Sequence, residues 1–437
     1  MLIVENILWL LVLIGAMILI HELGHFLAAR FFDVRVDAFS FGFGPRLFGF
    51  RRGETDFRVS AIPFGGYVKM AGEQSGDEAV GDPRSFVAKP RWQRLVIAFA
   101  GPFMNIALAV ALLTGLFLYK YPQPMVSDRT AIIGHVMPDS PAAAAGLREG
   151  DQIVGIEGVS NPNWEDVTVK ELSNANRPLR VDVNRGGKRV SVTVTPTLAQ
   201  KLGVGYAGWS QQAEIEVAGV TPGLPAEKAG LRAGDLLVNV NGRPIHSIYR
   251  VHDLIRASEG KPVEIDIIRE GRREKLVVQP VFNEAEKRWW IGFLPNQRII
   301  YTKLPLPEAF AQSVRQNVRG ATLIYELLRS IVARRMSAKS LDGPIRIAQL
   351  SGEAAREGAY SYINLMAAVS LNLAILNLLP IPILDGGVIL MLLFEMLIRR
   401  DLSMPVKEAV FKFGFVFLLM LMVFVIYNDI AKMLPAG

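Results

Sequence analysis

The sequence lacks cysteine altogether and has only five histidines among its 437 residues. The absence of cysteine excludes disulfide bonds, a thiolate metal site and a cysteine nucleophile. The histidines are His21, His25, His135, His246 and His252. Any metal site in this chain would therefore have to draw its remaining ligands mainly from carboxylates.

A basic surface pattern typical of nucleic-acid binding is also missing. The formal net charge is +7, but the lysines and arginines lie in loops next to acidic residues, and no stripe combines basic with aromatic side chains. We therefore expect no nucleic-acid partner.

Apolar residues are abundant instead. They make up 51% of the chain, against 20% charged residues, and four apolar stretches reach or approach the length that crosses a bilayer. These are Ile7–Ala29, Leu95–Tyr119, Tyr362–Leu379 with an apolar continuation, and Phe413–Tyr427. The predicted fold is a polytopic α-helical membrane protein with four transmembrane helices in the lipid bilayer. Met1–Asn6 has no basic residue, so we expect it to remain part of the first helix rather than belong to a cleaved signal peptide.

The distribution of positive charge predicts the orientation in the membrane. The loop from Arg30 to Arg94 is short and rich in arginine and lysine, so the positive-inside rule makes it cytoplasmic. Lys120–Gly358 would then lie outside the cytoplasm. Arg399 and Arg400 would return to the cytoplasmic side.

The outer segment contains an internal repeat. Asp139–Gly158 aligns with Gly223–Gly242 at a constant offset, since 230 − 146 and 235 − 151 both equal 84. Each copy has a helix that starts at proline, a glycine that ends it, and a Gly-Asp turn before a strand. This pattern looks like a PDZ domain, and we assign one to residues 128–198 and one to residues 213–283.

PDZ domains bind extended peptides as an added strand. Leu202–Gly205 and Ile291–Leu294 are the candidate groove loops. The grooves would bind a peptide, or they would be plugged and act only as a steric screen that excludes bulky ectodomains. The sequence leaves both interpretations open.

Residues 300–345 contain an amphipathic pattern. Steps of four and three residues place six side chains on one helix face. They are Val314, Val318, Ala321, Tyr325, Leu328 and Val332. Basic residues occupy the other faces, so we expect a helix on the membrane surface. A helix packed against the PDZ domains is the alternative.

The first apolar stretch carries the sequence His21-Glu22-Leu23-Gly24-His25. Because a helix has 3.6 residues per turn, His21 and His25 share one face and can bind one zinc ion, with Glu22 beside it. Ionisable groups are costly inside a bilayer and need partners or a function there. The alternative is a chance match whose histidines are satisfied structurally.

A lone carboxylate in the third apolar stretch supplies the missing ligand type. Asp385 follows a segment broken by Pro380 and Pro382, and broken backbone at membrane depth is tolerated only where protein or a water-filled cavity covers it. Asp385 could serve as N-cap of a helix over Val388–Ile398. Together with His21-Glu22-Leu23-Gly24-His25, however, metal ligation is the better interpretation.

These motifs, with Gly101–Asn105 and Ile62–Met70, occur in the order of the site-2 protease family of intramembrane zinc metalloproteases, which the chain resembles over nearly its whole length. The resemblance implies that His21, His25 and Asp385 bind Zn²⁺ and that Glu22 is catalytic. It places Asn372 and Asn377 near the substrate. Many relatives carry His or Arg where this chain has Val388, which puts a supporting role at that position in doubt.

The resemblance also implies a substrate and a location. Bacterial members cut single-span membrane proteins such as anti-sigma factors after a first cleavage, and signal peptides are a further candidate substrate. The chain would then be a multi-pass protein of the bacterial inner membrane. Its PDZ domains would be periplasmic, binding a peptide or an ectodomain, and its active site would lie toward the cytoplasm.

The loop between the first two spans contains a predicted membrane-associated β-hairpin. Phe57–Ile62 and Tyr67–Met70 alternate in polarity and are joined by residues 63–66. Its edge could hold an unwound substrate strand, so Gly65, Gly66 and Tyr67 are substrate-binding candidates, as are Pro380 and Pro382. A plain cytoplasmic hairpin is the alternative.

The residues of the expected zinc site lie in two segments, 1–120 and 355–437. Two competing functions remain for the chain. One is a membrane-tethered protease of soluble substrates, although the uncharged residues before His21 argue against an opening to bulk water. The other is a PDZ scaffold with a silent zinc site. Glu22 argues against the scaffold, because a purely structural site has no need of it.

Overall fold

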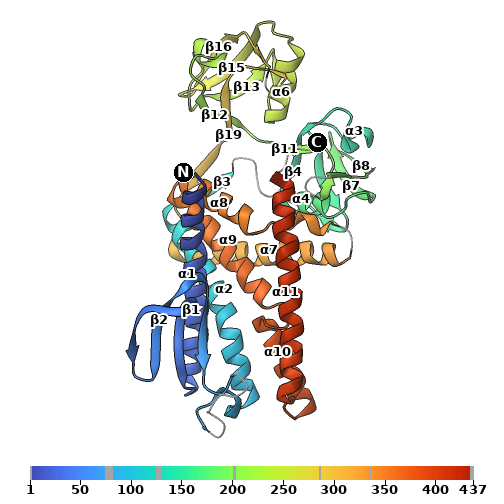
Figure 1. The fold of residues 1–437 in the computed structure, drawn as a ribbon. Coiled ribbons are helices and arrows are strands. Elements are labelled where there is room, and N and C mark those ends of the chain that lie inside the picture. Colours follow the sequence, from blue (N-terminus) through green and yellow to red (C-terminus); the bar gives the residue numbers. More distant parts are fainter. Residues whose placement is uncertain are drawn as a thin grey trace. The chain divides into compact units, whose positions relative to one another are not determined.

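The structure, a computed structural model, describes residues 2–73, 82–124, 130–199, 203–284, 287–333 and 336–433. They form two compact units (Figure 1). The first unit comprises residues 1–121, 303–325 and 341–437, and the second comprises residues 122–302 and 326–340. Leu202, in one predicted groove loop, lies outside the described residues.

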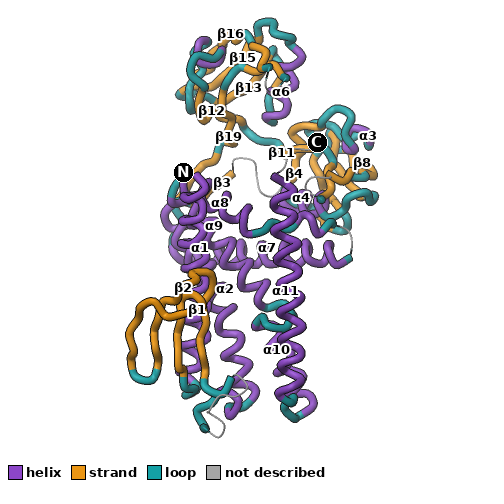
Figure 2. The backbone as a smooth tube through the Cα atoms, viewed as in Figure 1, coloured by secondary structure: helices purple, strands orange, loops and turns teal. Residues whose placement is uncertain are grey.

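The first unit is a helical assembly with one sheet (Figure 2). Its helices are α1 (Leu2–Phe31), α2 (Arg91–Tyr119), α8 (Pro344–Glu357), α9 (Ala359–Asn377), α10 (Asp385–Ile398) and α11 (Met404–Met433), and α7 (Leu306–Val332) begins in it. Helices α1, α9 and α10 all pack against α2. Its core therefore forms around α2.

Four helices among the described residues are long and apolar enough to cross a membrane. They are Leu2–Phe31, Arg91–Tyr119, Ala359–Asn377 and Pro405–Lys432. The four predicted spans are thus confirmed as candidate membrane helices by length and composition. The fourth starts at Pro405, eight residues before the predicted Phe413, because Lys407, Glu408 and Lys412 interrupt the apolar pattern there without interrupting the helix.

The sheet of the first unit pairs β1 (Val36–Arg52) with β2 (Thr55–Met70) beside the C-terminal half of α1 (Figure 1). Both strands bend, so β1 pairs with β2 twice. Val36–Phe41 lies between the 57–59 and 66–70 segments of β2. The predicted hairpin of Phe57–Ile62 with Tyr67–Met70 is therefore wrong in its pairing, because a segment of β1 separates the two. Gly66–Met70 is an outer segment of this sheet.

The exposure of α7 follows the predicted amphipathic pattern. Val318 and Tyr325 are 60% and 63% exposed, whereas Ala309, Ser313 and Asn317 are buried. Ser313 bonds Thr114 of α2 at 2.8 Å. The small and polar face of α7 thus packs inward and its apolar stripe is exposed.

The second unit contains two repeats with matching elements. The first repeat has strands β4 (Ala131–Val136), β5 (Gln152–Ile156), β6 (Val159–Ser160), β7 (Leu179–Arg185), β8 (Lys188–Val194) and β11 (Trp209–Gln211), with helices α3 (Pro141–Ala144) and α4 (Trp164–Leu172). The second repeat has β12 (Ile215–Val220), β13 (Leu236–Val240), β14 (Arg243–Pro244), β15 (Val263–Arg269), β16 (Arg272–Val278) and β19 (Phe293–Gln297), with α5 (Pro225–Lys228) and α6 (Ile248–Ala257). Shorter strands are β3 (Tyr121–Pro124), β9 (Thr197–Ala199), β10 (Val204–Tyr206), β17 (Val281–Asn283), β18 (Arg288–Trp290) and β20 (Ile299–Thr302).

The two sheets have equivalent strand orders, β11-β4-β5-β7-β8 and β16-β15-β13-β12-β19 read in opposite directions. Each repeat has its own apolar core, to which alternate residues of β7 and β15 contribute. The last strand of each sheet, β11 or β19, lies beyond the ends predicted at residues 198 and 283. Each of these strands follows a short hairpin, and the sequence of that hairpin does not indicate that the repeat continues after it.

One ion pair recurs at the same place in both repeats. Asp151 accepts hydrogen bonds from Arg185, and Asp235 accepts them from Arg269, each with a shortest distance of 2.7 Å. Both aspartates are buried. The repeat in the sequence is therefore a repeat of internal contacts and not only of turn residues.

Candidate metal centre

The two histidines of the first apolar stretch lie one turn apart on α1. Their Nε2 atoms are 3.3 Å apart. Both residues are buried, at 7% and 9% exposure. The helical spacing thus brings the two rings to one point inside the helical assembly, as predicted.

Asp385 reaches the same point from the other end of the chain. Its carboxylate oxygens lie 3.1 Å from His21 Nε2 and 3.4 Å from His25 Nε2. The proposed N-cap role is not what the structure has, because α10 begins at Asp385 itself and Leu384 occupies the N-cap position. The carboxylate is directed to the histidines instead.

The three residues approach one another at distances close to those in a tetrahedral metal site. Zinc bonds of about 2.0–2.1 Å at tetrahedral angles place ligand atoms about 3.3 Å apart. The two Nε2 atoms are 3.3 Å apart, Asp385 Oδ2 lies 3.1 Å from His21 Nε2, and the other oxygen of Asp385, Oδ1, lies 3.4 Å from His25 Nε2. This cluster of two imidazoles and one carboxylate can therefore hold a zinc ion and leave a fourth position open.

The break between α9 and α10 is what places Asp385. The chain leaves α9 at Asn377 and turns through residues 378–384, where Ile383 has φ +80°. A positive φ is a strained conformation for a β-branched residue, and such strain concentrates at functional sites. A Cβ on Gly386 would lie 2.3 Å from the carbonyl oxygen of Leu378. Glycine is therefore required where α10 starts against the turn.

Glycines also let α1 and α2 approach each other at the site. A Cβ on Gly24 would lie 2.3 Å from the Ala100 carbonyl oxygen, and a Cβ on Gly101 would lie 2.3 Å from His25 Nε2. Small residues are the usual means of close helix contact in membranes. Gly101 thus makes room for the imidazole ring itself.

Hydrogen bonds orient both imidazole rings from α2. His25 Nδ1 lies 2.8 Å from the Ile97 carbonyl oxygen, so it donates there and leaves Nε2 for a metal. His21 Nδ1 lies 3.2 Å from the Asn105 side-chain amide. The Asn105 Oδ1 atom is otherwise buried without a partner among the described residues. A 180° rotation of that amide lets Oδ1 accept the His21 Nδ1 proton and satisfies both groups.

A cavity of about 310 Å³ adjoins the cluster. Glu22, Gly66, Tyr67 and Asn377 line it together with the three ligand residues. The Val68 N–H donates to the Glu22 carboxylate. The outer segment of the β1–β2 sheet therefore borders the space beside Glu22.

The remaining substrate-binding candidates lie elsewhere. Gly65, Asn372, Pro380 and Pro382 are not among the residues that line this cavity. Asn372 and Pro380 are exposed. Pro382 packs against Gly414 of α11, since a Cβ added to Gly414 would lie 2.5 Å from the Pro382 side chain. The structure brings together Glu22, the three ligand residues and three of the seven substrate-binding candidates.

Asn105 and Gly101 are site residues to which sequence reasoning assigned no role. They stand four residues apart in Gly101–Asn105, so a helix presents both on one face. That spacing was a usable signal. The contact of Asn105 with His21 needs the packing of α2 against α1, which no local pattern reveals.

Known proteins are similar to this chain over nearly its whole length. The model of peptidase family M50 matches residues 9–421. Protease RseP of Yersinia pestis is 31% identical, with 98% of this chain and 100% of that protein covered. Regulator of sigma-E protease RseP of Salmonella typhimurium is 30% identical, with the same shares covered. A protein of Neisseria meningitidis named as a zinc metalloprotease is 31% identical over 95% of this chain and 96% of its own length. The chain therefore belongs to peptidase family M50, the site-2 proteases, and is a zinc metalloprotease of regulated intramembrane proteolysis in the inner membrane.

Proposed function

We propose that His21, His25 and Asp385 bind the catalytic zinc ion and that Glu22 is the general acid–base. The observation that carries this proposal is the convergence of three ligand residues, up to 364 positions apart, whose ring nitrogens and carboxylate oxygens approach to 3.1–3.4 Å. The Asn105 oxygen, buried next to His21 without a partner among the described residues, can accept a hydrogen bond from a protonated His21 Nδ1. The other ring nitrogen, Nε2, is then left for the metal.

The reaction is hydrolysis of a peptide bond within or near the transmembrane segment of a single-span membrane protein. A bound zinc ion supplies Lewis acidity that polarises a carbonyl and acidifies water. Glu22 accepts the proton of the attacking water and passes it to the leaving amide nitrogen. His25 and His21 are held in position by Ile97 and Asn105.

The β1–β2 sheet offers a place for an unwound substrate. A helical peptide hides its carbonyl groups in its own hydrogen bonds, so it has to become extended before attack. Gly66–Met70 forms an outer segment of the sheet and borders the cavity. An extended substrate can add to such an edge. Gly65, Gly66, Tyr67 and Asn377 would contact it, and Asn372, Pro380 and Pro382 would line its path further away.

The charge distribution supports the orientation. The basic loop between α1 and α2 lies on the cytoplasmic side by the positive-inside rule. His21 and His25 lie in the second half of α1 and so toward the cytoplasm. The two repeats, which we assign as two PDZ domains, would be periplasmic. The substrate would be a pre-cleaved protein like an anti-sigma factor, and signal peptides are a second group to test.

Glu22→Gln tests the assignment. We expect the purified variant to retain zinc, measured by atomic emission, because Glu22 is not a ligand. Its cleavage of a single-span model substrate in detergent should fall by about 10²–10⁴-fold, the usual contribution of a general base.

Three outcomes would contradict the proposal. Full cleavage by Glu22→Gln would remove Glu22 from the mechanism. Cleavage of a soluble form of the substrate at the same rate as of the membrane-bound form would favour a tethered protease of soluble proteins. Absence of cleavage by the parent chain would favour the silent scaffold.

A further inference from the structure

Charged side chains are buried together near the C-terminal end of α10. Glu395 is 0% exposed and Arg94 of α2 is 3% exposed. One carboxylate oxygen of Glu395, Oε1, lies 2.7 Å from Lys407 Nζ and accepts a hydrogen bond from the Leu402 N–H at 2.8 Å. The other, Oε2, accepts no hydrogen bond from the described residues and lies 3.9 Å from Arg94 Nη1. Burial of such charges is costly unless they are paired or have a function, and the proposed reaction uses none of them.

Arg94 joins this cluster to the helix that orients the histidines. It lies three residues before Ile97 on α2, whose carbonyl oxygen accepts the His25 Nδ1 hydrogen bond at 2.8 Å. Glu395 belongs to α10, whose first residue is Asp385. The contact between Arg94 and Glu395 therefore links the helix that holds a histidine ring to the helix that carries the carboxylate of the metal centre.

Few other side chains hold α10 in place. The structure describes all of α10, and its buried residues are Gly386, Gly387, Leu392 and Glu395. Large apolar residues of the helix are instead 42–80% exposed, and these are Leu390, Leu393, Phe394, Met396 and Leu397. The two buried glycines stand next to Asp385, so Leu392 and Glu395 anchor the rest of the helix.

A displacement at Glu395 would be transmitted to Asp385. The two residues stand ten positions apart on one helix, which is about 15 Å at 1.5 Å per residue. A regular helix of this length moves as a stiff body, whereas metal–ligand distances have to be correct to within about 0.2 Å. A small shift of α10 away from α2 would therefore separate the carboxylate from the two histidines.

We propose that Glu395 is a positioning residue for the metal centre. Together with Arg94 and Lys407, it fixes α10 against α2 and so keeps the Asp385 carboxylate at the two histidines. The inference rests on the proposed zinc site and adds the groups that set its geometry. A cluster that served only the stability of the fold would leave the metal affinity of the folded chain unchanged.

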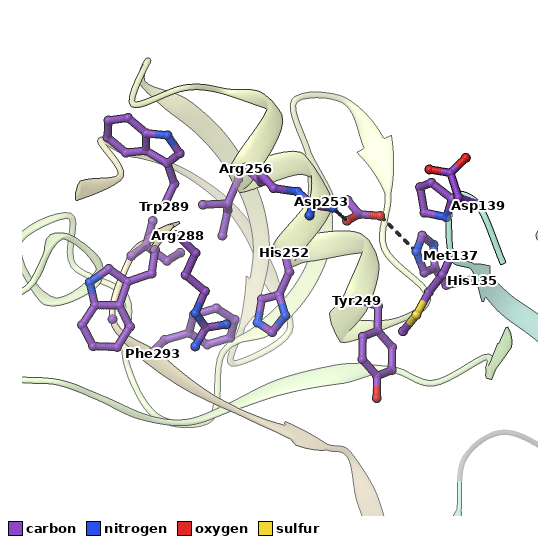
Figure 3. A pocket seen from close by; sticks show the side chains of 15 residues that line it. His135, Met137, Asp139, Tyr249, His252, Asp253, Arg256, Arg288, Trp289 and Phe293 are labelled. Carbon is purple, nitrogen blue, oxygen red and sulfur yellow. Dashed lines mark hydrogen bonds and ion pairs between the residues drawn. The ribbon is translucent and has the colours of Figure 1, made fainter. Parts of the chain in front are cut away.

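An ion pair of the second unit provides a matched control. His135 of β4 is 2% exposed, and its Nε2 atom lies 3.1 Å from Asp253 Oδ2 of α6 (Figure 3). Asp253→Asn and Glu395→Gln both replace a carboxylate beside a buried partner with an amide. Stability can change in both variants, but only Glu395→Gln alters a group between α2 and α10.

Five full-length chains are compared in detergent: the parent, Glu395→Gln, Arg94→Met, the double variant and Asp253→Asn. Zinc affinity, measured by competition with a chelator, should fall about 10–100-fold in Glu395→Gln, the usual cost of losing a group that orients a metal ligand. Arg94→Met should lose a similar factor. The double variant should lose no more than the larger single loss, because both side chains act through one contact.

Cobalt in place of zinc gives a second measurement. Its visible spectrum depends on the coordination geometry, so the spectrum of Glu395→Gln should differ from that of the parent chain. Asp253→Asn should match the parent in both zinc affinity and cobalt spectrum. Thermal unfolding identifies misfolded chains, and Glu395→Asp, which keeps the charge but is one methylene shorter, provides a second variant whose zinc affinity should also fall.

The opposite results would overturn the proposal. They are an unchanged zinc affinity and cobalt spectrum in folded Glu395→Gln or Glu395→Asp, additive losses in the double variant, or an equal loss in Asp253→Asn. Failure of the zinc site itself gives a different result, since Asp385→Ala would then bind zinc as tightly as the parent. If Asp385→Ala loses zinc and Glu395→Gln does not, only the positioning role of Glu395 is rejected.

Discussion

At the residue scale, Asn105 determines how His21 can present itself to a metal. It is fully buried, and its side chain lies 3.2 Å from His21 Nδ1. Its backbone carbonyl also accepts a hydrogen bond from Ser370 of α9 at 2.8 Å. The residue therefore links the metal cluster to two helices without being a ligand.

Replacing Asn105 with alanine should weaken zinc binding. The loss of a hydrogen bond that orients a metal-binding histidine usually costs about 10–100-fold in affinity. Competition with a zinc chelator measures the change. Asn372→Ala, on an exposed part of α9, should leave zinc affinity unchanged. Equal affinities of Asn105→Ala and the parent chain would refute this role of Asn105.

At the element scale, the closeness of α1 and α2 decides whether the cluster can form. Gly101 of α2 has no room for a Cβ, because His25 Nε2 would lie 2.3 Å from it. Among the described residues, and apart from its chain neighbours and the nearby backbone of its own helix, a Cβ on Gly115 would meet no atom within 4 Å. Alanine at either position changes the helix propensity in the same way, but only alanine at Gly101 would crowd a neighbouring side chain.

Gly101→Ala should therefore lose at least tenfold in zinc affinity. Gly115→Ala should retain the affinity of the parent, since alanine is simply a better helix former than glycine. Zinc retained after dialysis measures both. If Gly101→Ala binds zinc as tightly as Gly115→Ala, the close packing of α1 on α2 does not control the site.

The turn between α10 and α11 makes a pH-dependent contact with the start of α2. Asp401 lies 2.9 Å from Arg94 and 3.0 Å from Arg91. Partial burial would raise the pKa of Asp401, but the hydrogen bonds from Arg94 and Arg91 outweigh it and lower the pKa to about 2. An aspartate in an unfolded chain titrates near a pKa of about 3.9.

The depressed pKa predicts the sign of the pH dependence. Between the two pKa values the unfolded chain binds more protons than the folded chain, so stability falls as the pH falls. Asp401 should thus stabilise the fold above pH ~4 and cease to do so near pH ~2. Unfolding midpoints of the parent and Asp401→Asn should converge over that range. A difference that does not change with pH would show that the ion pairs contribute nothing.

At the scale of the whole molecule, the sequence predicted what local spacing can encode. Short stretches of sequence were enough to predict the helical spacing of His21 and His25 and the four spans. The repeat was found by comparing two such stretches 84 residues apart. Asp385 could be predicted as a ligand because a lone carboxylate in an apolar stretch is costly unless it has a partner or a function.

Contacts between distant segments could not be predicted in the same way. Gly66–Met70 pairs with β1 rather than with Phe57–Ile62, because register depends on how both strands bend. Glu395 is fully buried and lies 2.7 Å from Lys407, yet nothing in its neighbourhood in the sequence marks it.

The central claim is that two histidines and one aspartate of a cysteine-free chain hold the zinc ion. Zinc X-ray absorption of the purified parent chain tests it most directly. The account predicts two imidazole nitrogens at about 2.0–2.1 Å and a carboxylate oxygen at about 2.0–2.2 Å, with an open or water-filled fourth position. A spectrum with one imidazole or none would contradict the assignment of His21, His25 and Asp385.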